Sequence, residues 1–82
     1  MMMNPARKEP DVSTYSGRFA VRLRALREKV GKTVPEVADV MEVTIGTVYH
    51  WETGHTFPKP DQLPVLAKML ELKSVRTLFP EK

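Results

Sequence analysis

Two histidines, His50 and His55, carry the side chains in this sequence that most readily bind metal ions or transfer protons near neutral pH. Their five-residue spacing spans Gly54, a residue type that commonly ends a helix. The sequence contains no cysteine and offers no third ligand near the pair with the spacing of a zinc site. We therefore expect no metal site and no cofactor.

Catalysis by this chain is not expected either. The sequence has no Ser/His/Asp arrangement and no glycine-rich phosphate loop. A chain of 82 residues forms one domain around one core, which leaves no room for a deep substrate cleft. The prediction is a protein that is not an enzyme and has no small-molecule ligand.

Composition and charge indicate a globular protein with a locally basic surface. The chain is 41% hydrophobic and 28% charged, and it has neither a membrane-spanning apolar run nor a secretory signal. With no cysteine, it fits a reducing compartment, so we expect a cytoplasmic location and no membrane partner. Between residues 18 and 32, one acid (Glu28) stands among six basic residues, a run typical of a solvated helix face or of nucleic-acid contact: Arg18, Arg22, Arg24, Arg27, Lys29 and Lys32.

The apolar periodicity predicts the elements that position these side chains. Residues 1–15 show no periodicity and are interpreted as a flexible tail, followed by one domain over residues 16–82. Five helices and no strand are expected, near residues 17–31, 33–41, 44–53, 61–71 and 74–79. The expected core comprises Leu23, Leu26, Val37, Ala38, Val48, Trp51, Leu66 and Leu70, with Trp51 as an anchor between helices.

Cap residues mark several of the helix ends. Thr33 and Glu36 have the spacing of a capping box, and Thr44 precedes the third helix in the same way. Gly31 and Gly54 are expected to end the first and third helices. For the fourth helix we expect a cap at Asp61, because Pro64 then falls in the first turn and breaks no hydrogen bond.

The second and third predicted helices are short, are joined by a tight turn and form a helix-turn-helix unit. The most specific pattern is Trp51-Glu52-x-Gly54 followed by Pro58, in step with Ala38 and Val43. With this pattern, residues 22–79 resemble the phage Cro/repressor (XRE-like) type of helix-turn-helix domain. The resemblance implies a compact, all-α, five-helix, lambda-repressor-like fold. It also implies a transcriptional regulator that binds double-stranded DNA sequence-specifically, as a dimer, through a recognition helix over about residues 44–53.

The resemblance also implies roles for individual residues. Four positions of the recognition helix would face base edges: Ile45, Gly46, Tyr49 and His50. Phosphate contacts are expected at the helix starts and in the following loop, from Thr33, Thr44, Thr47, His55 and Lys59. Arg27 and Glu52 match a largely buried salt bridge that joins the first helix to the third.

Four positions depart from the family's pattern. Val34 replaces a glutamine that touches phosphate in many relatives, so that contact is not expected. Glu42 replaces the turn glycine, a change that costs about 1 to 2 kcal/mol if the backbone there is left-handed. Ile45 and Gly46 replace side-chain amides, which favours thymine-methyl contact and reading of DNA shape over hydrogen bonding. Arg76 stands where relatives often have an acid, at the expected dimer surface.

The last predicted helix is too apolar to be covered by its own few residues. We expect some of its neighbouring apolar side chains to form a dimer interface: Leu72, Val75, Leu78 and Phe79. An alternative function is an antitoxin-like or protein-interaction module that keeps the helix-turn-helix fold without using it on DNA. A salt-dependent interaction with duplex DNA would distinguish the two functions.

Overall fold

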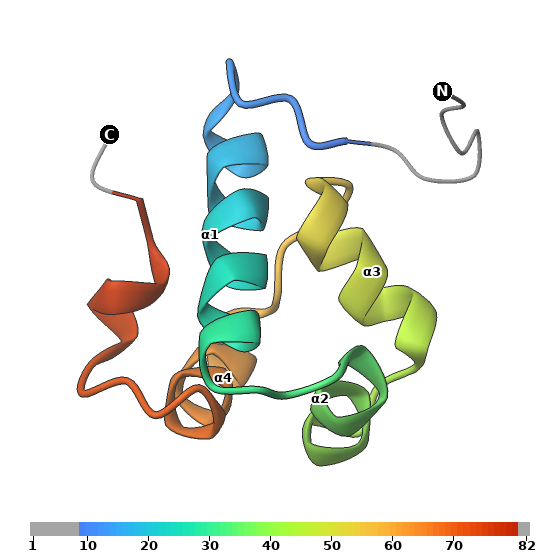
Figure 1. The fold of residues 1–82 in the computed structure, drawn as a ribbon, viewed down its shortest axis with the longest axis vertical. Coiled ribbons are helices and arrows are strands. Elements are labelled where there is room, and N and C mark those ends of the chain that lie inside the picture. The colour runs from blue at the N-terminus through green and yellow to red at the C-terminus, as the bar shows by residue number, and fades with distance from the viewer. Residues whose placement is uncertain (1–8, 81–82) are drawn as a thin grey trace.

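The computed structural model describes residues 9–80, which form four α-helices and two short 3-10 helices without any strand (Figure 1). The helices are α1 (Tyr15–Lys29), α2 (Val34–Met41), α3 (Ile45–Thr53) and α4 (Leu63–Met69). The 3-10 helices are η1 (Pro60–Gln62) and η2 (Val75–Leu78). The predicted all-α class is confirmed.

Helix α1 begins two residues earlier than predicted because Thr14 caps it. The Thr14 hydroxyl accepts a hydrogen bond from the Gly17 N–H at 3.0 Å, and the Thr14 N–H donates to the Asp11 carbonyl at 3.1 Å. The resulting turn lies so close to Gly17 that a Cβ there would collide with the Asp11 carbonyl. Of the predicted tail, residues 1–8 lie outside the described residues. Gly31, with φ of 74°, ends the helix as predicted.

The two helices of the central motif have the predicted caps. At α2 the Thr33 hydroxyl accepts from the Glu36 N–H at 3.2 Å, and the Thr33 N–H donates to the Glu36 carboxylate at 2.7 Å. At α3 the Thr44 hydroxyl accepts from the Thr47 N–H at 3.2 Å. Helix α2 ends at Glu42 in a left-handed conformation, with φ of 60°, and α3 ends at Gly54 with φ of 83°.

The C-terminal third differs from the prediction in two places. Asp61 does not cap α4: it lies within η1, the α-helix starts at Leu63, and Pro64 falls in the first turn as expected. The predicted helix over residues 74–79 is instead the 3-10 turn η2. Its bonds run from the Thr77 N–H to Ser74 and from the Phe79 N–H to Arg76, three residues apart. Phe79 is already extended, with φ of −99° and ψ of 141°, because the following Pro80 disfavours a helical backbone at this residue.

Helix α1 packs against α3 on one side and η2 on the other, and α2 packs against α3 and α4 (Figure 1). Side chains from all of these elements form one core. Seven of the eight predicted core residues are buried, and Leu26 is partly exposed against them. Trp51 is 2% exposed and is an interhelical anchor, as predicted. Phe19 was not in the predicted core, yet it is fully buried between the rings of Phe57 and Phe79, at centroid distances of 4.8 and 5.4 Å. Its place in the apolar stripe of α1 is the signal that could have included it.

Candidate nucleic-acid interface

Helix α3 has one buried and one exposed face. Val48, Trp51 and Glu52 point into the protein. The opposite face carries all four residues predicted to face bases: Ile45 is 45% exposed, Tyr49 is 49% exposed, and Gly46 and His50 are exposed between them. In the structure, the four positions predicted to face bases therefore lie on one accessible face of α3.

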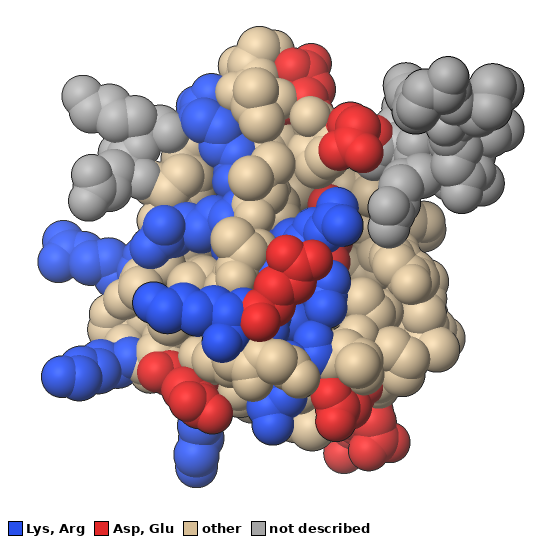
Figure 2. Space-filling view, viewed as in Figure 1, with Lys and Arg blue, Asp and Glu red and all other residues tan. Residues whose placement is uncertain are grey.

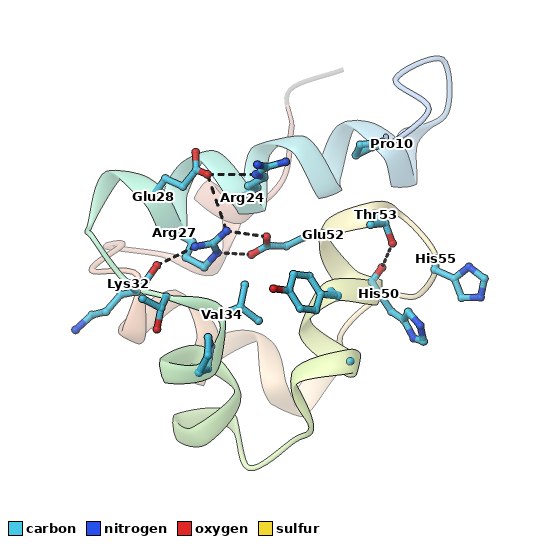
Figure 3. Close-up of a pocket in the computed structure, with 14 residues that line it drawn as sticks. Pro10, Arg24, Arg27, Glu28, Lys32, Val34, His50, Glu52, Thr53 and His55 are labelled. Carbon is cyan, nitrogen blue, oxygen red and sulfur yellow. Dashed lines mark hydrogen bonds and ion pairs between the residues drawn. The ribbon is translucent and has the colours of Figure 1, made fainter. Parts of the chain in front are cut away.

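Arg27 and Glu52 form the predicted buried pair, which we call the brace (Figure 3). The Arg27 Nε donates to Glu52 Oε2 at 2.6 Å, and Nη2 donates to Oε1 at 3.0 Å. A third bond runs from Nη1 to the carbonyl of Lys32 at 2.9 Å, in the loop before α2. The hydrogen bond to Glu52 raises the pKa of Arg27 against the opposing effect of desolvation. One guanidinium thus joins α1, α3 and the loop that leads into α2.

The two motif helices present different N-termini to an anion. At α3 the hydroxyl of the cap residue Thr44 lies 3.0 Å from the Thr47 hydroxyl. The N–H groups of Ile45 and Gly46, in the first turn, point out of the helix end. At α2 the Thr33 N–H is already bonded to the Glu36 carboxylate, and Pro35 has no N–H. The start of α3 is therefore better suited to bind a phosphate than the start of α2, where Thr33 was also predicted to do so.

An open groove lies between α1, the start of α2 and α3, and it brings several predicted residues together (Figure 3). Thr33, Gly46, Tyr49, His50 and His55 line it. Arg24 and Lys32 line the same groove, although the sequence prediction assigned them no site; their membership in the basic run was the available signal. Lysine and arginine side chains are spread over the α1 side of the molecule in Figure 2. Lys59 is exposed in the loop after α3 but does not line this groove.

The histidine rings lie 4.9 Å apart at the end of this groove. Among residues 9–80, no group of three or more metal-ligating side chains could hold an ion. The His50 carbonyl accepts bonds from the N–H groups of His55 and Thr56 at 2.9 and 3.3 Å. These bonds fold the following loop back onto the end of α3 and so place His55 beside His50.

Gly46 has space around it. A Cβ built there would have the Thr44 hydroxyl at 3.8 Å as its nearest neighbour, and the backbone φ is not positive. Nothing in the packing of the described residues therefore requires a glycine at this position. A glycine within a helix costs about 1 kcal/mol relative to alanine.

The predicted dimer surface needs one correction. Leu78 is fully buried inside the protein's own core, because Arg22 Nε donates to the Thr77 carbonyl at 2.8 Å and holds η2 against α1. Leu72, Val75 and Phe79 are partly exposed and pack against the core from the outside. Any interface at this end of the molecule would consist of these three side chains without Leu78.

The fold and the groove define a class of protein, a small helix-turn-helix domain whose third helix is tied to the first by a buried ion pair. Residues 18–78 match a family described as helix-turn-helix domain, and the chain belongs to that family. No curated protein matches the sequence closely enough to count as a relative. None of the helices in the described part of the chain combines the length and apolar character needed to cross a membrane.

Several solved structures are similar. One is the restriction-modification controller protein C.AhdI from Aeromonas hydrophila, with 27% identity and a TM-score of 0.69, over 76% of this chain and 92% of that one. The clp gene regulator ClgR from C. glutamicum has 25% identity and a TM-score of 0.65, over 73% and 77% of the two chains. Hydroxypropylphosphonic acid epoxidase from S. wedmorenis has 32% identity and a TM-score of 0.73. That match covers 82% of this chain but only 35% of the epoxidase.

Proposed function

We propose that this chain binds double-stranded DNA by placing α3 in the major groove and acts in this way as a transcriptional regulator. The observation that carries the proposal is the exposed face of α3. The Arg27–Glu52 brace ties the opposite face of this helix to α1, and the N-terminus of the helix is open to an anion. Recognition helices contact base edges with residues near their N-termini. C.AhdI and ClgR, described as a controller protein and a gene regulator, are consistent with this function.

Gly46 gives a direct test of this surface. Because a Cβ fits at this position in the free protein, Gly46→Ala should stabilise α3 by about 0.5 to 1 kcal/mol and raise the melting temperature. The same methyl group would stand between the helix backbone and a base edge, so the affinity for DNA should fall. A variant that is more stable but binds more weakly separates the binding surface from the fold.

The experiment selects bound duplexes from a random pool and then titrates the protein against a selected and a scrambled duplex at two salt concentrations. Val65→Ala on α4 is the matched control, because it also places alanine at an exposed helix position and lies outside the groove. Unchanged affinity of Gly46→Ala for the selected duplex would show that α3 is not the DNA-binding surface.

The remaining contacts are proposed to divide by chemistry. Ile45 and His50 would read bases, so their replacement by alanine should change the preference between sites by about 1 to 3 kcal/mol for each good contact. Thr44 and Lys59 would contact phosphate, so Thr44→Ala and Lys59→Ala should weaken binding to all sequences alike. Lys59→Ala should also reduce the salt slope by about one. Thr33, Thr47 and His55 are proposed as further phosphate contacts, and Tyr49 as a base-facing residue.

A homodimer on DNA is part of the proposal. Leu72, Val75 and Phe79 would supply its apolar contact, which is small enough that DNA would be needed to hold the two copies together. Two copies would cover half-sites about one helical turn, roughly 34 Å, apart. A footprint of one half-site at saturating protein would rule out this arrangement.

A second function, a protein-interaction domain, is favoured by one observation. The epoxidase match shows that a domain similar to this one, at 32% identity, forms about a third of a protein named as an enzyme. In that case the exposed face of α3 would contact another protein or domain. The same DNA titration decides between the two functions. If α3 contacts a protein and not DNA, the affinity for duplex DNA should show no systematic dependence on salt concentration.

A further inference from the structure

The first turn of α3 exposes an apolar side chain at the surface. Ile45 is the first residue of the helix and is 45% exposed, and Gly46 has no side chain. The hydroxyls of the flanking Thr44 and Thr47 are 3.0 Å from each other, and Thr44 also caps the helix. The end of α3 that would lie deepest in the major groove therefore offers hydrocarbon in place of an amide or a charged group.

In the major groove, only one feature of a base pair matches such a side chain. Thymine carries a methyl group on C5, whereas every other recognition group on the base edges is a hydrogen-bond donor or acceptor. Ile45 can bury that methyl group, and the missing Cβ of Gly46 allows the helix backbone to approach closely enough for contact. The same C5 methyl group occurs in 5-methylcytosine.

Building on the proposed function, we propose that Ile45 makes this chain a reader of pyrimidine C5 methyl groups, so that 5-methylcytosine is distinguished from cytosine as thymine is from uracil. Ile45 has no donor or acceptor for the group on C4, the thymine oxygen or the cytosine amine. Its contact therefore responds to the methyl group in both base pairs. DNA methylation would thus change the affinity of the chain for its sites.

The test uses two comparisons in which the methyl group is the sole difference. After a site has been selected from a random pool, each thymine is replaced in turn by uracil, with adenine kept opposite. At the position that responds, the base pair is then changed to guanine with cytosine or with 5-methylcytosine. Burial of one methyl group corresponds to roughly a fourfold change in affinity. We expect the affinity to fall by this factor when thymine is replaced by uracil. We expect it to rise by the same factor when cytosine is replaced by 5-methylcytosine.

Variants assign the effect to Ile45. Ile45→Ala should lose both methyl effects while keeping its melting temperature, because the side chain is exposed. Ile45→Val should keep part of each effect, and Val65→Ala should keep both in full. The inference is overturned if the wild type binds the selected duplex but no uracil replacement weakens it, or if Ile45→Ala keeps the wild-type methyl effects. Absence of binding to every duplex would overturn the proposed function as well, so the two failures are distinguishable.

Discussion

At the scale of single residues, Arg27 and Glu52 have the strongest structural role in the described chain. Their side chains are only 12% and 5% exposed, and both guanidinium–carboxylate bonds join residues that are 25 positions apart in sequence. Removing one partner of a buried pair leaves the other charge uncompensated, which costs more than the pair itself contributes.

Glu52→Ala should therefore lower the free energy of unfolding by about 3 to 5 kcal/mol, measured by urea denaturation. Arg24→Ala is the control, because it breaks an exposed ion pair with Glu28 at 3.2 Å and should cost less than about 1 kcal/mol. Equal losses in the two variants would mean that the brace is worth no more than a surface pair.

Glu36 links stability to pH. Hydrogen bonds from the Thr33 N–H hold the pKa of this carboxyl group below its ordinary value. Since the folded pKa is the lower one, the stabilisation is complete above the ordinary carboxyl range and is lost as the pH falls through the folded pKa. Asp11 contributes with the same sign, through its bonds to Ser13.

Glu36→Gln keeps the shape of the capping residue but does not titrate. We expect this variant to lose less stability than the wild type between pH 7 and pH 3, as measured by urea midpoints at both values. An identical loss in the two proteins would show that the acid sensitivity arises elsewhere. Adding Asp11→Asn should reduce the sensitivity further.

At the scale of elements, the turn between α2 and α3 contains a residue poorly suited to its backbone. Glu42 has φ of 60° and ψ of 43°, a left-handed conformation that costs an ordinary L-residue roughly 1 to 2 kcal/mol. Glu42→Gly should raise the free energy of unfolding by about 1 kcal/mol. Gly54→Ala, at φ of 83°, should have the opposite sign. Thermal or urea denaturation of both variants tests these two expectations. A Glu42→Gly variant less stable than the wild type would contradict the expected strain at Glu42.

Sequence patterns predicted these elements well where local chemistry decides them. Caps at Thr33 and Thr44 and glycines at 31 and 54 act within one turn of the chain, so their spacing is sufficient. The sequence pattern does not predict burial that depends on contacts between residues far apart in the chain. Leu78 is buried because Arg22 holds η2 against α1, and Phe19 is enclosed by rings from residues 57 and 79. Arg24 lines the groove because α1 and α3 lie side by side, and Lys32 lines it because its loop is bonded to Arg27 of α1.

At the scale of the whole molecule, the helix-turn-helix pair is not an independent unit. Helix α3 packs on α1 as well as on α2, and the brace adds an ion pair to its contact with α1. The N–H groups of α3 should therefore exchange with solvent only when α1 also unfolds. Native-state hydrogen exchange should give the same opening free energy for Val48 and Leu23. A markedly lower value for α3 would show local opening of the recognition helix.

The turn over residues 11–14 sets the direction from which the chain enters α1. It folds across Gly17 and leads to Pro10, which lines the same groove as His50 and His55 (Figure 3). Pro80, at the other end, lies against the opposite side of α1, beside Val21 and Ala25. A fluorophore or affinity label attached at residue 10 would therefore lie at the groove along α3. The same label attached at residue 80 would leave that groove free.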